Sequence, residues 1–357
     1  MIGRWTLTLC LALALTACAP RGIIEPGNSV VGATVRGVYV ARFRQDTGQA
    51  RNFGEARSGE LVFGRVDVSI PPNHEVGRIE WPRGEPNGAT DFVTVGGAQY
   101  PDINQFARAI AAADKSGENE TVLHVHGYNT THGEAVYGTA QVAHDLEVPV
   151  PMVVFSWPSA AQTAGYVYDR DSALISRDIL EEVIVTLARQ PNRKLFLTAH
   201  SMGSHLLMET LRQIALSGRL DLEREINGVI LMAPDIDTEL FREQVSRMGD
   251  LPVPFIVMIA EQDRALRFSG TLTGRGVRLG SIDHPEDLAG LGLTVVDVGS
   301  LSDGRRFDHN IATTSPAALA IFKRLNEVTP PGDLHVVDSV VQADQAGGFL
   351  SRIVGGQ

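Results

Sequence analysis

Apolar runs and amphipathic segments follow one another along most of the chain beyond residue 120. Runs without helical spacing occupy residues 122–126, 150–155, 195–198, 226–232, 254–259 and 294–298. Continuous apolar runs of this length are typical of strands whose two faces are both covered. Segments with helical spacing lie between or after them, at 139–146, 172–188, 202–216, 238–248 and 317–325. The alternation predicts an α/β fold, with a mostly parallel, doubly wound sheet and helices on both faces.

The region before residue 120 has a different pattern. Residues 36–44 predict a first strand, and residues 60–70 alternate apolar and polar side chains as a half-buried strand does. A loop rich in Pro and Gly follows from 69 to 86, and residues 103–113 predict a helix. Two strands of antiparallel type therefore precede the alternating part. Residues 270–292 show no clear regularity and predict a loop or a small cap.

The first residues have the pattern of a processing segment. Arg4 precedes an apolar stretch from 5 to 15, which is too short to cross a bilayer and indicates a signal peptide. Leu-Thr-Ala-Cys18 resembles the lipobox of bacterial lipoproteins, in which the cysteine becomes the lipidated first residue. An ordinary secretory signal, cut near Ala17 or Ala19, is the alternative. The resemblance implies a cell-envelope protein anchored by lipid on Cys18; because Ala19 is not an aspartate, it implies the outer membrane, facing the periplasm.

Cysteine usage favours the lipobox. Cys10 and Cys18 are the two cysteines, so a chain cut before Cys18 keeps one thiol at its first position, and acylation gives that thiol a purpose. The predicted organisation is a signal peptide (1–17), a tether (18–35), an α/β domain (36–328) and a C-terminal tail (329–357).

Composition excludes some partners. The 357 residues include 43% hydrophobic and 20% charged residues, as in an ordinary globular protein, and carry a formal net charge of −11. An acidic surface repels nucleic acid and anionic lipid, so we expect neither as a direct partner. No motif indicates a cofactor. Nothing in the pattern specifies an oligomeric state.

The strongest chemical signal is Leu195-Phe-Leu-Thr-Ala-His-Ser201-Met-Gly203. An apolar strand ends at a serine flanked by small residues, and a helix follows, which is the order of a nucleophile elbow. The usual pattern is G-x-S-x-G, and Ala199 replaces the first glycine. Strand and helix nearly touch at such a turn, so small residues are needed two positions either side of the serine. Ala199 and Gly203 meet that need.

A serine nucleophile requires a histidine as base and a carboxylate that orients the histidine, in the chain order Ser, acid, His. Asp263 directly follows the run 254–259 and is the predicted acid. Asp235, after the run 226–232, is the alternative, although its place before the helix at Thr238 also suits an N-cap.

Four histidines compete for the role of base. His309 follows the last apolar run and precedes the closing helix, and it is the predicted base. His284 precedes that run and lies in a Pro-containing loop. His205 is one turn into the helix after the serine, and His200 is expected to point away from the serine in a tight turn.

The oxyanion of a tetrahedral intermediate needs two preset N–H donors. The backbone N–H of Met202, directly after the nucleophile, is the first. The second is expected from the loop after 122–126, where Gly127 allows close approach and the N–H of Tyr128 is the predicted donor. His124 and His126 have no Cys or Glu partner at metal spacing, so no metal site is predicted.

Several motifs together resemble one bacterial family. They are Val-His126-Gly-Tyr-Asn129, Phe155-Ser-Trp-Pro-Ser159, Gly165-Tyr-Val-Tyr-Asp169 and Ala199-His-Ser-Met-Gly203, with Val38-Tyr-Val-Ala and Ser69-Ile-Pro-Pro-Asn-His74 upstream. In this order they are similar to an α/β-hydrolase family catalogued as domain of unknown function nine hundred, from about residue 37 to 325. The resemblance implies the α/β-hydrolase fold and the serine machinery of the esterase/lipase superfamily, and it fits alanine in the elbow. It implies no substrate.

The substrate is therefore predicted only by class. Trp157, Tyr166 and Tyr168 are candidates for an acyl pocket, and ordinary packing is an equal alternative. No long apolar cap is visible, which favours a small-molecule substrate, a small or medium acyl ester, over lipid at an oil interface. An amidase or peptidase would use the same triad. A protein of a different class, with the same fold but no catalytic activity, could serve as an envelope scaffold or binding module. Such a protein would have no reason to keep a serine, an acid and a histidine in the order of a triad.

Overall fold

The computed structural model describes residues 22–43, 57, 60–260, 263–272, 274 and 277–299. Nine strands of the described residues form one sheet. They are β1 (Thr34–Phe43), β2 (Leu61–Ile70), β3 (Val93–Tyr100), β4 (Glu120–Val125), β5 (Met152–Ser156), β6 (Lys194–His200), β7 (Ile226–Met232), β8 (Phe255–Ile259) and β9 (Thr294–Asp297).

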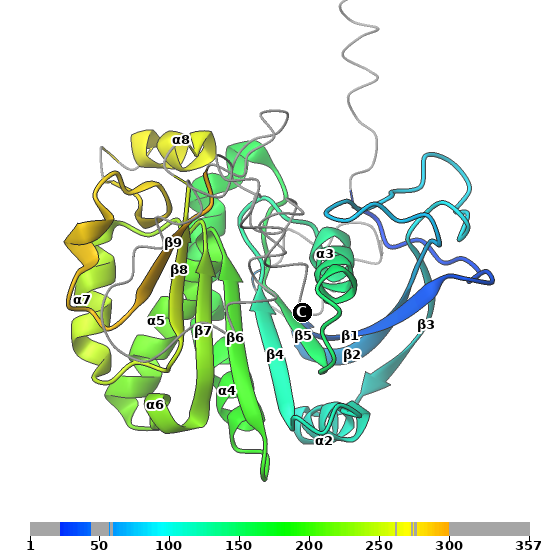
Figure 1. Cartoon of the computed structure of the whole chain (residues 1–357), viewed down its shortest axis with the longest axis horizontal. Helices are drawn as coiled ribbons and strands as arrows, with labels where there is room; N and C mark the ends of the chain where they lie inside the picture. The colour runs from blue at the N-terminus through cyan, green and yellow to red at the C-terminus, as the bar shows by residue number, and fades with distance from the viewer. Residues whose placement is uncertain are drawn as a thin grey trace, which may run out of the picture.

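The sheet has the order β3-β2-β1-β5-β4-β6-β7-β8-β9 (Figure 1). β1 pairs with β2 and β2 with β3 in antiparallel fashion, while every pairing from β1–β5 to β8–β9 is parallel. β4 lies between β5 and β6, and its Val125 is opposite Phe155 on one side and Ala199 on the other. Parallel strands bring their carboxyl ends to one edge of the sheet, so the segments after β4, β6, β7 and β8 meet there.

Helices cover both faces of the sheet (Figure 1). α3 contacts β1, β2 and β5 on one face, whereas α2, α4, α5 and α7 contact the sheet or one another on the other face. α8 lies at the carboxyl ends of the strands in the view of Figure 1. The longer helices of the described residues are α2 (Ile103–Ala113), α3 (His132–Asp145), α4 (Tyr166–Ala188), α5 (Met202–Ser217), α7 (Thr238–Met248) and α8 (Arg264–Leu272). The short ones are α6 (Leu222–Glu225) and the 3-10 turns η1 (Thr163–Gly165), η2 (Leu279–Ser281) and η3 (Pro285–Leu288).

The predicted α/β fold is confirmed, and several element bounds agree with the sequence pattern. α2, α7 and β7 have the predicted bounds. α3 and α4 begin six or seven residues earlier than the apolar pattern indicates. The start of α3 is set by a capping box, in which Thr131 and Glu134 each bond the other's backbone N–H. The region 270–292, predicted as a loop or small cap, contains the end of α8 and two 3-10 turns.

Two features of the N-terminal part do not follow from the pattern. β3 was not predicted, because Gly96 and Gly97 interrupt its alternation, yet it pairs with β2. Part of the predicted tether is packed on the domain: Gly27 donates to the Thr94 carbonyl, Thr94 donates to the Glu25 carbonyl, and Ile24 joins a cluster of buried side chains around α3. The composition of that segment indicates irregular backbone, but irregular backbone can still bond to an edge strand.

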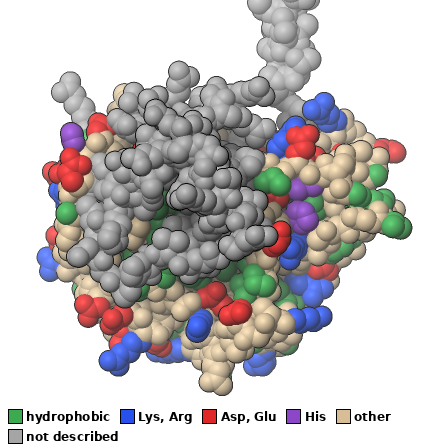
Figure 2. Space-filling view, in the orientation of Figure 1, with side chains coloured by type: hydrophobic (Ala, Val, Ile, Leu, Met, Phe, Trp, Pro, Cys, Tyr) green, Lys and Arg blue, Asp and Glu red, His purple; other side chains and the backbone are tan. Residues whose placement is uncertain are grey.

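Within the described ranges, no helix has the length and apolar character required to cross a membrane. Figure 2 shows acidic and basic side chains interspersed over the described surface of one face. The predicted signal peptide with Cys18, the C-terminal tail, the helix at 317–325 and His309 lie outside the described residues.

Candidate active site

Ser201 occupies a sharp turn between β6 and α5. Its backbone has φ +54° and ψ −123°, a left-handed value that costs a non-glycine residue about 1–3 kcal/mol. The turn is held from both sides, because the Ser201 N–H donates to the Met232 carbonyl at 2.9 Å and the Asp235 N–H donates to the Ser201 carbonyl at 3.1 Å. The predicted order of strand, serine and helix is confirmed, and the strained backbone of the serine is a feature that only the structure shows.

Gly203 explains why the elbow needs a small residue after the serine. A Cβ at Gly203 would lie 2.3 Å from the His126 carbonyl oxygen and 2.5 Å from that of Val125. Both are backbone atoms, which cannot swing aside. The first turn of α5 therefore rests directly on the end of β4, while Ala199, two residues before the serine, is fully buried in the sheet.

The loop after β4, residues 126–130, lies beside the serine, and we call it the oxyanion loop after its predicted role. A Cβ at Gly127 would lie 3.1 Å from Ser201 Cβ and 2.7 Å from His200 Nδ1. His126 Nδ1 donates to the Gly127 carbonyl at 2.9 Å. The C=O of Gly127 and the N–H of Tyr128 belong to one trans peptide and point in opposite directions. His126 therefore fixes the direction of the Tyr128 N–H.

Asp169 holds the other end of the oxyanion loop. Its fully buried carboxylate accepts the Asn129 N–H at 3.1 Å, the Ser159 hydroxyl at 2.6 Å and the Ala160 N–H at 2.6 Å. Asn129 has a φ of +55°, so the loop adopts a conformation that needs such support. Burial raises the pKa of Asp169 and outweighs the hydrogen bonds that lower it. Asp169 thus ties the oxyanion loop to α4 and to the segment after β5.

The predicted pocket aromatics make framework contacts. Trp157 is 2% exposed, stacks on the His126 ring and donates its indole N–H to the His126 carbonyl at 2.8 Å. Tyr166 is buried and donates to Asp235 at 2.8 Å, while its ring meets Tyr128 edge to face. Tyr168 is half-buried beneath the Arg57 guanidinium. These contacts give Trp157 and Tyr166 packing and positioning roles around the elbow.

The two candidate acids have different surroundings. Asp263 is fully buried just beyond β8, and one of its oxygens accepts the N–H groups of Ala265 and Leu266 at 2.8 and 3.1 Å. Asp235 is also buried, but Tyr166 bonds one oxygen while Ser269 and the Arg278 guanidinium contact the other at 2.7 and 3.3 Å. The N-cap of α7, which the sequence offered as a role for Asp235, belongs to Asp237.

The candidate histidine bases within the described ranges differ in how exposed their side chains are. His284 is largely exposed and pairs with Glu286 at 3.1 Å. His205 is buried in α5, and burial lowers its pKa to about 4. His200 is half-buried, and its Nδ1 lies beside Gly127, where a Cβ would be 2.7 Å away. The predicted base, His309, lies outside the described residues.

A comparison with known protein families identifies the family to which this chain belongs. A family model described as alpha/beta hydrolase of unknown function (DUF900) matches residues 104–325, more than half of the 357-residue chain. The chain belongs to this family. The match includes the elbow, the oxyanion loop, both candidate acids and the position of His309. The protein is therefore an α/β hydrolase, as the motifs predicted.

Similar solved structures are lipases and esterases. Aspergillus fumigatus lipase B is 15% identical to this chain, with a TM-score of 0.42. The match covers 66% of this chain and 60% of the lipase, so this chain spans less than two thirds of the length of the lipase. Brefeldin A esterase, a bacterial homologue of human hormone sensitive lipase, shares 14% identity with a TM-score of 0.37, over 86% of this chain and 77% of that one. Carboxyl esterase 2 from Tuber melanosporum shares 12% identity with a TM-score of 0.39, over 88% and 96%. A comparison with curated proteins finds no match.

Sequence reasoning missed the support of the oxyanion loop in this hydrolase. Asp169 and Ser159 stand in motifs that carry the family resemblance, yet their spacing from Asn129 indicates no contact. The signal available was a motif aspartate at the start of an otherwise amphipathic helix. The motif placed the residue within the family resemblance, and only the structure shows what it binds.

Proposed function

We propose that this α/β hydrolase is a serine hydrolase that cleaves small or medium acyl esters, with Ser201 as the nucleophile. The observation that carries the proposal is the left-handed backbone of Ser201 between β6 and α5. A strained non-glycine residue persists only where its surroundings enforce it, and such residues gather at functional sites. Gly203 and Gly127 are the glycines that allow this turn to lie against β4.

In the proposed reaction, Ser201 Oγ attacks the ester carbonyl carbon while His309 takes the hydroxyl proton. The tetrahedral oxyanion is stabilised by the N–H groups of Met202 and Tyr128. His309 then gives the proton to the departing alcohol, which leaves an acyl-enzyme. Water, deprotonated by His309, attacks the acyl carbon and releases the carboxylic acid and free Ser201.

Asp263 is the proposed partner of His309. It is buried and follows β8, between Ser201 and His309 in the chain, so it satisfies the order of serine, acid and histidine, as Asp235 also does. Asp235 is a poorer candidate because Tyr166, Ser269 and Arg278 contact both of its oxygens. We therefore assign Asp235 to the framework beside the elbow.

Labelling with a fluorophosphonate probe tests the nucleophile. Wild-type protein is expected to be labelled, and Ser201→Ala is expected to abolish both labelling and ester turnover. Ser204→Ala is the matched control, because Ser204 is buried three residues later in α5, with no hydrogen-bond partner for its hydroxyl in the described structure. Equal labelling of wild type and Ser201→Ala would end the proposal.

The substrate class is tested with a panel of acetyl, butyryl, octanoyl and lauroyl esters and the matching amides. We expect kcat/KM to be greatest for a short or medium acyl chain and to be lower for each amide. Faster turnover of the amides would make the protein an amidase. Activity that appears only above the solubility limit of the lauroyl ester would make it an interfacial lipase.

We also propose a lipid anchor on Cys18. Cleavage before Cys18 removes Arg4 and makes the net charge one unit more negative than −11, so charge does not hold the protein on an anionic membrane. Several acyl chains on one cysteine anchor stably, whereas a single chain holds weakly. Cys18→Ser is expected to release active enzyme from the membrane fraction or to leave an unprocessed precursor. Wild-type protein that is wholly soluble and carries no lipid on Cys18 would contradict this.

A further inference from the structure

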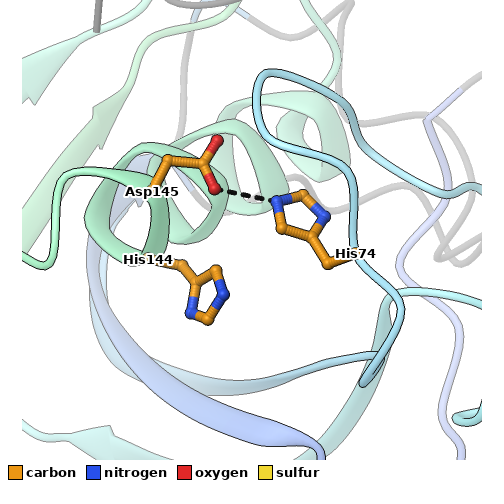
Figure 3. A group of neighbouring side chains, drawn as sticks. All are labelled: His74, His144 and Asp145. Carbon is orange, nitrogen blue, oxygen red and sulfur yellow. Dashed lines mark hydrogen bonds and ion pairs between the residues drawn. The ribbon is translucent and has the colours of Figure 1, made fainter. Parts of the chain in front are cut away.

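A cluster of histidines and carboxylates lies away from the elbow, where the loop after β2 meets the end of α3 (Figure 3). Figure 3 shows His74 from that loop turned toward Asp145 and His144 at the end of the helix. One ligand-type atom from each of the three residues lies within 4.8 Å of the other two. His74 Nε2 is 2.8 Å from Asp145 Oδ1, and the rings of His74 and His144 are 5.3 Å apart and nearly perpendicular.

The contacts around the cluster aim its ligand atoms inward. Glu80 Oε2 is 2.8 Å from His74 Nδ1 and Asp145 Oδ1 is 2.8 Å from Nε2, so both ring nitrogens donate to carboxylates, and Nε2 would give up its proton to bind an ion. The other carboxylate oxygen of Asp145 accepts the Gly77 N–H at 2.7 Å and the Gln141 amide at 2.5 Å, which leaves Oδ1 toward His74. A carboxylate behind a ligating histidine, and donors behind a ligating carboxylate, are the usual outer contacts of a metal site.

Within the described structure, the His144 ring makes no hydrogen bond to His74 or Asp145, whereas those two residues bond to each other. The His144 Nδ1 is buried and has no hydrogen-bond partner among the described residues. In Figure 3 the other ring nitrogen, Nε2, is the one turned toward His74, so Nε2 is the atom that an ion in the cluster would contact. The side chains of His74 and Asp145 are 5% and 0% exposed, so the ligands would be largely shielded from water.

We propose that His74 Nε2, His144 Nε2 and Asp145 Oδ1 bind one Zn²⁺, with Glu80 as the outer partner of His74. Two imidazoles and one carboxylate form a ligand set that zinc commonly uses, with a fourth position for water. The carboxylates of Asp145 and Glu80 offset the two charges of the ion. Binding requires the His74–Asp145 contact to open from 2.8 Å to about 3.3 Å, the separation of two ligands in a tetrahedral zinc site.

The proposed role is structural. α3 has 14 residues and so spans roughly 20 Å, with Asp145 at its last turn and the oxyanion loop just before its first. An ion at the cluster would join the loop that contains His74 and Glu80 to α3 without touching the elbow. This inference does not depend on the proposed esterase activity.

Zinc binding is measured on untagged full chain that has been stripped with EDTA and dialysed. Calorimetric titration with ZnCl₂ and metal analysis after gel filtration are expected to give one ion per chain, and zinc is expected to raise the Tm. His144→Ala removes one ligand but keeps the contacts of His74 with Glu80 and Asp145, so it is expected to fold and to bind zinc more than tenfold more weakly. Glu80→Gln is expected to weaken binding by about tenfold or more.

His284→Ala is the matched control, because His284 is exposed and pairs only with Glu286 in the described structure. It is expected to bind zinc as wild type does. Absence of stoichiometric binding to the stripped wild type, or undiminished binding by His144→Ala, would overturn the proposal. Fluorophosphonate labelling of Ser201 is expected to be the same with EDTA and with zinc, so failure of the metal site and failure of the proposed activity are separate results.

Discussion

Histidine side chains occupy contrasting environments in two regions of this hydrolase. Around the elbow, burial lowers the pKa of His124 and His132 to about 3 and that of His126 and His205 to about 4. In the cluster at the end of α3, burial also opposes charge on His74, but its hydrogen bonds to Asp145 and Glu80 outweigh burial and raise its pKa.

The contrast shows two ways of fixing a loop. The elbow region is held by close backbone contact and contains histidines whose pKa is lowered by burial, while the buried Asp169, Asp235 and Arg278 beside it are tied into hydrogen bonds and an ion pair. The loop after β2 is joined to α3 by the ionic contacts of His74 and also by stacking of Trp81 on Tyr137. Substitutions near the elbow are therefore expected to change catalysis, and similar substitutions in the N-terminal part of the sheet to change stability alone.

The largest effect is expected from Asp263→Asn. Loss of the carboxylate leaves His309 without an orienting charge, and in other triads this change costs about 10⁴-fold in kcat. Steady-state hydrolysis of a short ester measures it. Asp235→Asn is the control, since it removes an equally buried carboxylate beside the elbow. A near-normal Asp263→Asn together with a crippled Asp235→Asn would reverse the assignment of the acid.

Two matched glycine substitutions compare the regions directly. Gly203→Ala places a Cβ 2.3 Å from the His126 carbonyl, and Gly97→Ala places one 2.4 Å from the Arg65 carbonyl in β2. Both are expected to lower the free energy of unfolding by about 1–3 kcal/mol. The effect of Gly97→Ala is expected to be smaller, because β3 is at the edge of the sheet and can shift.

Only Gly203→Ala is expected to lower kcat, since only it displaces β4 from the elbow. Urea denaturation and ester hydrolysis measure the two effects. Gly138→Ala is the control: a Cβ there meets nothing within 4 Å, and alanine favours the helix. Equal loss of kcat in Gly97→Ala and Gly203→Ala would show that the two regions are not functionally separate.

The difference between local patterns and long-range contacts explains how much of the fold and the site could be predicted from the sequence. The elbow was predictable because strand, serine and helix are consecutive, and β7 and α7 because their patterns are strong and local. Asp169 bonds Asn129 from 40 residues away, and His74 meets Asp145 from 71 residues away. No local pattern records contacts of that kind, because the fold of the sheet creates them.

A smaller effect is expected from Asp169→Asn. In the wild type, the Asn129 N–H, the Ser159 hydroxyl and the Ala160 N–H all donate to the Asp169 carboxylate. Asparagine has nearly the same size, but its amide NH₂ would face one of these donors and could not accept a hydrogen bond from it. The Tyr128 N–H then loses part of its orientation, and we expect kcat to fall by about 10–100-fold, less than the loss of a whole oxyanion donor.

KM is expected to change little, because Asp169 does not contact the substrate in the proposed reaction. The control is Asp171→Asn, whose side chain is 61% exposed. Asp169→Glu is expected to recover part of kcat if the carboxylate can still reach its donors. If the Asp169→Asn variant had an unchanged kcat but a lower free energy of unfolding, Asp169 would be a purely structural residue.

The smallest effect concerns acid stability. His132 is buried, contacts the Ser156 hydroxyl at 3.0 Å and has its pKa lowered to about 3, mainly by burial. The unfolded chain binds a proton at this residue below about pH 6.5, whereas the folded chain does so only near pH 3. A lowered pKa of a histidine means that its contribution to stability is present above pH 6.5 and is lost as the pH falls toward 3.

His132→Asn removes that proton uptake while keeping a polar group near Ser156. Between pH 6 and 4 the free energy of unfolding of wild type is expected to fall more steeply than that of the variant, by about 1.4 kcal/mol per pH unit. Urea denaturation at several pH values measures the two slopes, and the carboxylates common to both proteins cancel in the difference. His284→Asn, at an exposed site, is expected to leave the slope unchanged. Parallel slopes for wild type and His132→Asn would mean that His132 titrates in the folded chain as it does in the unfolded one, and that burial does not keep it neutral.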